Sequence, residues 1–498
     1  MYDLIIIGGG INGTGIARDA VGRGLKVLLC EKDDLAHFTS SSSSKLIHGG
    51  LRYLEHYEFR LVGEALSERE TLLRIAPHII WPLEFVMPHM PELRPAWMIR
   101  IGLLLYDHLG KRETLPGSRG VALGGAGYGE NIRSDIQKGF VYSDCWVDDA
   151  RLVALNARSA ADMGAVIKTR TACVGGRRSP DGWEIDLRDA SGNVAIEKAK
   201  CVVNAAGPWV KSLLDGELRQ NSVPTTRANI KQVKGSHIVV PRLFPGQHAF
   251  ILQNNDKRIV FMIPYEHDFT LIGTTDVEVT DAPGASSISP AEIEYLCRAV
   301  NRYLTKPVGP TDVVWSYSGV RPLYDDGESD PSAITRDYTL MLDVAYPQAP
   351  LLSVFGGKIT TYRKLAEAVM DKLRPSFPHM KGSWSGTQPL PGGEIPGGRF
   401  EAFVEELERR YSALPADYLH ALARRHGARV PLVLGDARTI DELGAWFGHT
   451  LYSREVDYLR NQEWALTAAD ILWRRTKCGL HLTPEQRDGV VAYLASSH

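Results

Sequence analysis

The sequence predicts a three-part α/β protein. Its parts are a parallel sheet flanked by helices, an inserted domain built on an antiparallel sheet, and an all-α C-terminal domain. Three observations support this. A strand, a glycine-rich turn and a helix open the chain within residues 2–31. Residues 225–320 contain short runs that alternate as antiparallel strands do. Charged amphipathic helices follow the proline- and glycine-rich stretch 389–398, which we interpret as a linker.

The opening unit is a strand, a helix and a second strand. Leu4-Ile5-Ile6-Ile7 is an apolar, largely β-branched run, which is typical of a strand buried on both faces. A helix is expected over residues 13–23 and a second strand over 26–30. Together they form a βαβ unit of about thirty residues, the size of a dinucleotide-binding unit.

A G-x-G-x-x-G pattern joins the first strand to the helix. Gly8 permits the tight turn, Gly10 lets the backbone approach a pyrophosphate, and Gly13 lets helix and strand pack closely. The helix N-terminus offers N–H groups and partial positive charge to phosphates. Glu31 ends the second strand, where it can accept hydrogen bonds from a ribose and would repel a 2′-phosphate. The predicted ligand is therefore FAD or NAD(H), not NADP. A glycine-rich turn in an ordinary α/β core is the alternative.

The composition is that of a globular protein large enough for two or three domains. Its 498 residues are 44% hydrophobic and 23% charged, and the net charge of −2 gives no indication of nucleic-acid binding. Six cysteines occur without a C-x-x-C pair, which favours reduced cytosolic thiols and predicts no metal site. We expect no signal peptide before Leu4. We also expect no membrane-spanning helix, since no apolar run reaches about 18 residues.

A serine run, residues 39–44, follows the predicted ribose-binding acid, and Gly49-Gly50 comes shortly after. Such a run is usually a linker. Here it lies at the carboxyl end of the sheet, where ligands bind, so its hydroxyls can bond a pyrophosphate and the glycine pair permits close approach to a flat ring. Two later stretches, 201–207 and 351–358, also run from a strand into glycine, which indicates further close approaches to the same ligand.

Periodicity and capping residues predict the other elements; Asp148 is a predicted helix cap, and Ser289 with Glu292 a predicted capping box. Helices are expected over 61–76, 148–163, 290–304, 359–373, 399–411, 416–426, 453–461, 467–477 and 484–495. Strands are expected over 165–168, 171–174, 183–187, 194–198, 237–240, 249–252, 258–263, 269–273 and 313–320. Residues 117–129 are expected to form a glycine-rich loop.

Longer motifs are more specific than the glycine triplet. They are SSSKLIHGGLRY at 42–53, YSDCWVDDAR at 142–151, NAAGPW at 204–209, GTTD at 273–276, FGGK at 355–358 and WRRTK at 473–477. With the βαβ unit, they resemble the bacterial, aerobic, FAD-dependent glycerol-3-phosphate dehydrogenases over nearly the whole chain. Those enzymes are quinone-linked and membrane-associated, and their FAD-binding fold resembles that of D-amino-acid oxidase.

The resemblance implies a division into domains. The FAD-binding, Rossmann-like domain would comprise residues 1–80, 145–224 and 321–385. The substrate or cap domain would comprise residues 81–144 and 225–320, and the helical domain residues 390–498.

Noncovalent FAD is the implied cofactor. Its binding residues would be Gly8, Gly10, Ile11, Asn12, Gly13, Glu31, Ser42, Ser43, Ser44, His48, Gly49, Gly50, Leu51, Val174, Gly207, Trp209, Gly356, Gly357, Lys358 and Thr360. A histidine at position 48 could also suggest a covalent flavin, but the family binds FAD noncovalently.

The implied reaction is oxidation of sn-glycerol 3-phosphate at C2 to dihydroxyacetone phosphate. A phosphate dianion calls for arginine and lysine. The residues that match the family's substrate pocket are Arg52, Tyr53, His237, Arg321, Arg336 and Lys358. Of these, His237, Arg321 and Lys358 are predicted to be catalytic, with His237 accepting the hydroxyl proton. His48 is a second candidate base. A structural histidine, and arginines paired at the surface, are the alternatives.

Electrons would pass to ubiquinone, so the enzyme is expected to lie on the inner face of the cytoplasmic membrane without crossing it. The apolar stretch Arg94–Arg112, with its flanking cations, is the candidate contact; a core helix is the alternative. A homodimer is also expected. The competing functions are a glycerol-3-phosphate oxidase, which in this family carries a mid-chain insertion not apparent here, and a non-catalytic flavin sensor.

Overall fold

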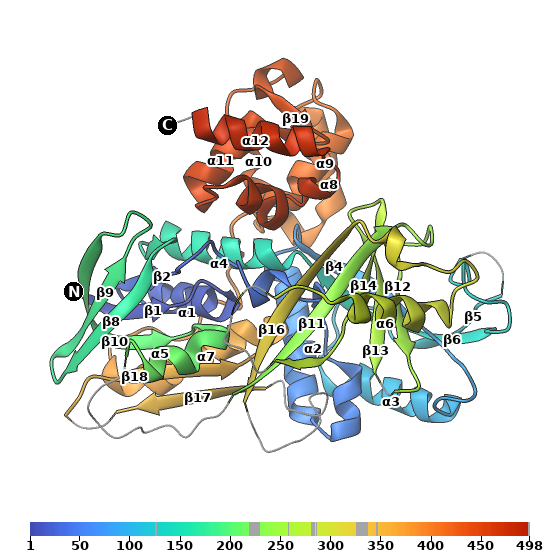
Figure 1. The fold of residues 1–498 in the computed structure, drawn as a ribbon, viewed down its shortest axis with the longest axis horizontal. Helices are drawn as coiled ribbons and strands as arrows, with labels where there is room; N and C mark the ends of the chain where they lie inside the picture. Colours follow the sequence, from blue (N-terminus) through green and yellow to red (C-terminus); the bar gives the residue numbers. More distant parts are fainter. Residues whose placement is uncertain are drawn as a thin grey trace.

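The computed structural model describes residues 1–124, 127–218, 230–256, 258–279, 284, 286–324, 337–344 and 347–496. Two large sheets lie side by side and a helical domain stands against the first of them (Figure 1). The six cysteines are all free thiols.

The first sheet has the order β17-β18-β10-β1-β2-β7. Its strands are β1 (Tyr2–Ile7), β2 (Val27–Cys30), β7 (Val166–Lys168), β10 (Val194–Asn204), β17 (Tyr338–Asp343) and β18 (Leu351–Gly356). Along this order all pairings are parallel except that of the edge strand β17 with β18. An antiparallel hairpin of β8 (Ala172–Ser179) and β9 (Gly182–Arg188) joins the sheet through pairing of β9 with β10. Leu4, Ile5 and Ile6 are fully buried, as their apolar run predicts.

Helix α1 (Ile11–Gly22) packs between α4 (Asp149–Asp162) and α7 (Tyr362–Leu373). The predicted cap of α4 is confirmed, because the Asp148 side chain accepts the Arg151 N–H at 3.2 Å. Two short helices, η3 (Gly207–Trp209) and α5 (Val210–Asp215), follow β10.

The second sheet has the order β15-β11-β14-β13-β12-β4-β6-β3, with β16 paired to β11 and β5 to β6. Its strands are β3 (Leu46–Ile47), β4 (Ile80–Pro88), β5 (Arg119–Ala122), β6 (Lys138–Val147), β11 (Ile230–Pro241), β12 (Ala249–Gln253), β13 (Ile259–Tyr265), β14 (Phe269–Gly273), β15 (Val277–Val279) and β16 (Trp315–Tyr324). Helix α6 (Pro290–Asn301), which begins with the predicted capping box, covers one face. Helices α2 (Phe59–Ile75) and α3 (Ala96–Leu109) pack against the other face.

The helical domain contains α8 (Phe400–Arg410), α9 (Ala416–His426), α10 (Val430–Leu434), α11 (Ser453–Glu463) and α12 (Pro484–Ser496) around its own core. A small hairpin, β19 (Trp446–Gly448) with β20 (Leu451–Tyr452), interrupts the helices. Residues Asp470–Arg475 form a π-helical turn within the predicted helix 467–477. The linker is packed rather than loose, since Leu390 is buried and its N–H bonds the Ile75 carbonyl at 2.8 Å.

The predicted domain division stays a prediction, and one predicted loop is wrong. The domain boundaries at 144/145 and 320/321 fall inside the single strands β6 and β16. The stretch predicted as a loop over 117–129 contains β5. Strand β4 was not predicted, because Pro82 and Pro88 lie within it. Proline is a local signal against a strand, but pairing of β4 with β6 and β12 overrides it.

Candidate active site

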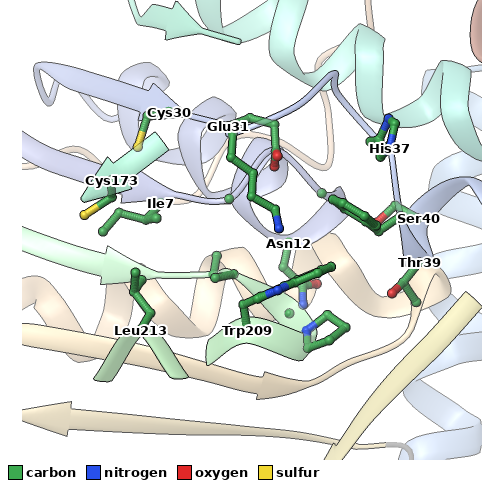
Figure 2. Close-up of a pocket in the computed structure, with 18 of the residues that line it drawn as sticks. Ile7, Asn12, Cys30, Glu31, His37, Thr39, Ser40, Cys173, Trp209 and Leu213 are labelled. Atoms are coloured by element: carbon green, nitrogen blue, oxygen red, sulfur yellow. The ribbon is translucent and has the colours of Figure 1, made fainter. Parts of the chain in front are cut away.

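A cavity of about 350 Å³ lies at the carboxyl ends of β1, β2, β10 and β18. In a parallel sheet these strand ends share one edge, which is where ligands bind. Figure 2 shows Glu31, Ser40, Asn12 and Trp209 around this hollow. Gly8, Gly10, Ile11, Asn12, Glu31, Val174, Gly207 and Trp209, all predicted cofactor residues, line it.

The three glycines of the first turn differ in their surroundings. A Cβ on Gly8, whose φ is +116°, would lie 2.4 Å from the Ala205 carbonyl oxygen. A Cβ on Gly13 would lie 1.9 Å from the Gly8 carbonyl oxygen. Gly10 is different, because its Cβ would meet only the Ser40 hydroxyl, at 3.0 Å. Gly8 and Gly13 therefore permit close packing, and Gly8 and Gly10 both line the cavity.

Glu31 is held at the wall by backbone donors. Its Oε2 accepts the Gly9 N–H at 2.6 Å and its Oε1 accepts the Asp33 N–H at 2.9 Å. Burial raises the pKa of Glu31, although these two bonds act in the opposite direction. A carboxylate oxygen has more than one lone pair, so the side chain still has accepting capacity for ribose hydroxyls.

A second cavity, of about 200 Å³, continues the first and shares Ile11, Thr39, Ser40, Pro322, Gly356 and Gly357 with it. Together they form one groove between the two sheets. The predicted residues that line the second cavity are Ser42, Ser43, Ser44, His48, Tyr53, His237, Arg321, Lys358 and Thr360.

His237 lies on β11 and is buried in the second cavity. Its Nε2 hydrogen-bonds the Ser44 hydroxyl at 2.9 Å, and its ring stacks on Tyr317 with centroids 4.8 Å apart. Its Nδ1 has no hydrogen-bond partner among the residues that the structure describes. Burial, with Lys45 and Arg321 nearby, holds the pKa of His237 well below its usual value, so the imidazole is neutral at physiological pH.

Two cations face the same cavity. Arg321 lies on β16, and its Nη2 is 3.0 Å from Asp276 Oδ1 and donates to the Thr275 carbonyl at 3.2 Å. The Lys358 ammonium lies 4.6 Å from the centre of the Tyr53 ring. His48 stays neutral beside them, since burial and Lys358 lower the pKa of its imidazole to about 3.

Several predicted residues have other surroundings. Gly13, Gly49, Gly50 and Leu51 line neither cavity. The Gly49 N–H instead bonds the Tyr106 hydroxyl at 2.8 Å. Arg336 lies outside the described residues, as does the Arg52 side chain.

The serine hydroxyls already make bonds within the protein. Ser42 donates to Phe38, Ser43 to Asp149, and Ser44 pairs with His237. Ser40 belongs to the predicted serine run but was not among the named cofactor residues; it accepts the Ile11 N–H at 3.0 Å at the start of α1.

Lys32 was also missed. Its ammonium lies 3.7 Å from the centre of the Trp209 ring across the first cavity. Residues 32–40 directly follow Glu31, the predicted ribose-binding acid, and this position in the sequence is the signal that could have indicated them. No pattern in that stretch shows which of its side chains face the groove.

The groove has the features that FAD requires. Gly8 and Gly10 with the N-terminus of α1 form a cradle for a pyrophosphate, and Glu31 supplies an acceptor for a ribose. Asn12 Oδ1 is a buried polar atom at the groove without a partner among the described residues. The groove then continues into the second cavity, where a flavin ring would meet His237 and the cations.

Comparisons with known proteins decide the family. The profile described as FAD dependent oxidoreductase matches residues 3–363, and the profile of the C-terminal domain of alpha-glycerophosphate oxidase matches residues 384–495. A glycerol-3-phosphate dehydrogenase of Pseudomonas aeruginosa is 53% identical over all of this chain and 96% of its own. The chain belongs to the FAD-dependent glycerol-3-phosphate dehydrogenase family.

Other relatives agree with this. A D-erythritol 1-phosphate dehydrogenase of Brucella abortus is 52% identical over all of this chain and 98% of its own. Among solved structures, the FAD complex of glycerol-3-phosphate dehydrogenase from Bacillus halodurans has a TM-score of 0.75 and 26% identity, over 100% of this chain and 94% of that one. The protein is thus an FAD-dependent enzyme with the predicted fold.

Proposed function

We propose that the enzyme oxidises sn-glycerol 3-phosphate at C2 to dihydroxyacetone phosphate. The observation that carries this proposal is the second cavity, where a neutral, buried histidine and two cations face the cofactor groove. Bound FAD supplies the acceptor for the C2 hydride. The protein must then bind the phosphate, orient C2 and accept the hydroxyl proton.

His237 is the proposed proton acceptor. It is neutral, and among the described residues its imidazole hydrogen-bonds only Ser44, through Nε2, which leaves Nδ1 available. A base with a pKa far below neutral is weak in the ground state, so proton transfer would accompany loss of the hydride and formation of the carbonyl. Arg321 and Lys358 are the proposed phosphate ligands, joined by Arg52 and Arg336.

D-Erythritol 1-phosphate is the second candidate substrate, because a relative named for it is almost as similar as the glycerol-3-phosphate dehydrogenase. Both compounds are polyol phosphates. The test is the visible spectrum of the purified enzyme after anaerobic addition of each phosphate, with glycerol as the phosphate-free control. Fast bleaching by glycerol 3-phosphate alone supports the proposal. Preferential bleaching by the erythritol ester would reassign the substrate, and no bleaching by either would favour a flavin sensor.

We further propose that ubiquinone is the electron acceptor. Support comes from the relatives of more than half identity, which are named dehydrogenases. The oxidase alternative is tested by mixing the substrate-reduced enzyme with a soluble quinone or with oxygen. Reoxidation should be faster with the quinone; equal or faster reaction with oxygen would support an oxidase. The homodimer stays a prediction that sedimentation can test.

A ubiquinone reductase must reach the bilayer, and we propose that α3 lies on the inner face of the cytoplasmic membrane. No helix in the described part of the chain is long and apolar enough to cross it. The side chains of Trp97, Met98, Ile101, Leu104 and Leu105 are 44–64% exposed, so α3 is not simply a core helix. Two expected contacts are wrong: Ile99 and Leu103 are buried against α2 and the second sheet.

The flanking cations are less available than expected. Arg94 pairs with Glu55 at 2.7 Å, Lys111 with Glu113 at 2.5 Å and Arg112 with Asp107 at 3.2 Å. The apolar side chains are therefore the main contribution to bilayer contact in this proposal.

Liposome flotation tests the surface. Leu104→Glu should lower both flotation and quinone-linked turnover while substrate still bleaches the flavin. Val194→Glu, at an exposed apolar residue of the first sheet, is the matched control and should float as the unaltered protein does. Equal flotation of both variants would place the contact surface elsewhere.

A further inference from the structure

One loop contributes lining residues to both cavities of the groove. Residues 31–45, here called the cofactor loop, connect β2 to β3. Glu31, Lys32 and residues 36–40 line the first cavity, and Ser42–Ser44 line the second. The positions of both the FAD site and His237 therefore depend on what holds this loop.

The helical domain holds the first part of the loop. Asp34 is fully buried, and Arg475 donates to both of its carboxylate oxygens at 2.8 and 2.9 Å. Arg474 Nε adds a third bond at 2.7 Å. Burial alone would raise the pKa of Asp34, but Arg475 and Arg474 hold it below its usual value. The ionised Asp34 carboxylate thus anchors the loop in a buried interface with the helical domain.

A second set of contacts between the loop and the helical domain runs through Arg170. The Asp33 carbonyl accepts the Arg170 N–H at 2.9 Å, and the Arg170 guanidinium bonds Asp470 of the helical domain. Asp470 also accepts N–H groups of Leu466 and Thr467 at 2.9 Å, which fixes its own orientation.

The other end of the loop is held through the start of α4. Lys477 donates to Asp148 at 3.0 Å, and the next residue, Asp149, accepts the Lys45 ammonium at 2.8 Å and the Ser43 hydroxyl at 2.7 Å. Lys45 and Asp149 are both buried. This end of the loop is therefore fixed by Asp149, and the helical domain holds the neighbouring carboxylate, Asp148.

These contacts lead directly to His237. Ser44, between Ser43 and Lys45, bonds its Nε2, and the Ser43 carbonyl accepts the hydroxyl of Tyr317, on which the His237 ring stacks. A movement of Ser43 would thus displace both supports of the imidazole.

We propose that residues 470–477 of the helical domain form a clamp that sets the cofactor loop, retaining FAD at one end and positioning His237 at the other. The clamp comprises Asp470, Arg474, Arg475 and Lys477. It gives a role to the WRRTK motif, whose residues line neither cavity. Its effect on FAD is independent of the reaction. Its effect on His237 rests on the function proposed above.

The proposed effect on FAD binding, here called the FAD arm of the proposal, is tested by Arg474→Met. This variant removes one of the two arginines that bond Asp34 and leaves Arg475 in place. Loss of a bond between charged groups predicts about tenfold weaker FAD binding, measured as the dissociation constant by flavin fluorescence after reconstitution. The matched control is Arg429→Met. It breaks another contact with the helical domain, the 3.0 Å pair with Asp162, at the opposite end of α4.

The control should bind FAD as the unaltered protein does, even if it melts at a lower temperature. Arg474→Lys should recover part of the loss. Equal FAD affinity in Arg474→Met and Arg429→Met, with both folded by circular dichroism, would overturn this arm.

The proposed effect on the position of His237, here called the His237 arm, is tested by Lys477→Met at saturating FAD. Because small misplacement of reacting groups is costly, flavin reduction should slow by about tenfold while the FAD dissociation constant stays within about threefold. Lys477→Arg should restore the rate. Unchanged reduction in Lys477→Met would overturn this arm. If His237→Ala also reduced at the normal rate, the proposed base would be wrong instead, and the FAD arm would stand.

Discussion

The two ends of the groove are built in different ways. At the FAD end, the cradle for the pyrophosphate is built of backbone: Gly8, Gly10 and the first turn of α1 come from one continuous segment. The substrate end consists of side chains from separate strands and loops, with His237 on β11, Arg321 on β16 and Lys358 after β18. One end can be recognised locally, whereas the other depends on how distant strands pair.

Strand register shows this dependence at His237. It pairs with Gly273 on one side and Tyr317 on the other. A Cβ on Gly273 would lie 2.1 Å from the imidazole, so that glycine provides space for the ring, and Tyr317 provides the stacking surface. A slip of one residue would turn His237 to the opposite face of the sheet. The difference between the two ends predicts different responses to substitution.

The largest effect is expected from Gly10→Val, which should give a folded but colourless protein. Its side chain would point into the cavity wall and meet only the Ser40 hydroxyl, so the fold tolerates it and the pyrophosphate does not. Flavin absorbance per protein and the melting temperature measure this. Gly120→Val, where nothing lies within 4 Å of a Cβ, is the control and should stay yellow. A yellow Gly10→Val protein with full flavin content would contradict the predicted pyrophosphate position.

His237→Ala should slow flavin reduction by about 10²–10⁴-fold, the usual range for loss of a general base, with FAD still bound. Stopped-flow absorbance measures the rate. His48→Ala is the comparison, since His48 lines the same cavity, and its reduction rate should fall by less than about tenfold, below the range for loss of a base. If His48→Ala were the slower variant, the two histidines would exchange roles.

Lys358→Met should lower kcat/KM for glycerol 3-phosphate by about 30-fold or more, because truncating one member of a buried charge pair costs about 2–5 kcal/mol. The slow oxidation of glycerol, which has no phosphate, should change much less. Arg336→Ala is expected to fall in the same range. Lys364→Met, at a half-exposed lysine paired with Glu367 on α7, is the matched control. An effect of Lys358→Met that is equal for both substrates would remove Lys358 from the phosphate site.

The smallest effect concerns pH. Burial, Lys45 and Arg321 lower the pKa of His237 well below 6.5, so it stays neutral in the folded enzyme as the pH falls. Flavin reduction should therefore change by less than about twofold between pH 8 and pH 6.5. A rate that halves near pH 6.5 would indicate an ordinary histidine.

The same shift affects stability. The unfolded chain binds a proton at His237 near pH 6.5 and the folded protein does not, so the stability due to this group is present above that pH and is lost as the pH falls below it. His237→Gln should lessen the decline of melting temperature below pH 6.5.

The pyrophosphate cradle, the family and most element types could be predicted from the sequence alone. A strand, three glycines and an acid act through backbone geometry within one unit of the chain, so their spacing is enough to predict the site. Ser289 and Asp148 were likewise recognisable as caps, because capping depends on neighbours within one helical turn.

Local patterns did not show which side chains of residues 32–45 face the groove. Nor did they show that Asp34 holds this loop against the helical domain and that Asp149 holds its other end. Within α3, the tertiary structure also separates the exposed apolar side chains from the buried Ile99, Leu103 and Tyr106. These contacts join residues hundreds of positions apart, such as Asp34 and Arg475. Their side-chain types are common, and no local spacing marks them as partners. Long-range ion pairs and sheet register depend on the packing of whole elements, which local patterns do not specify.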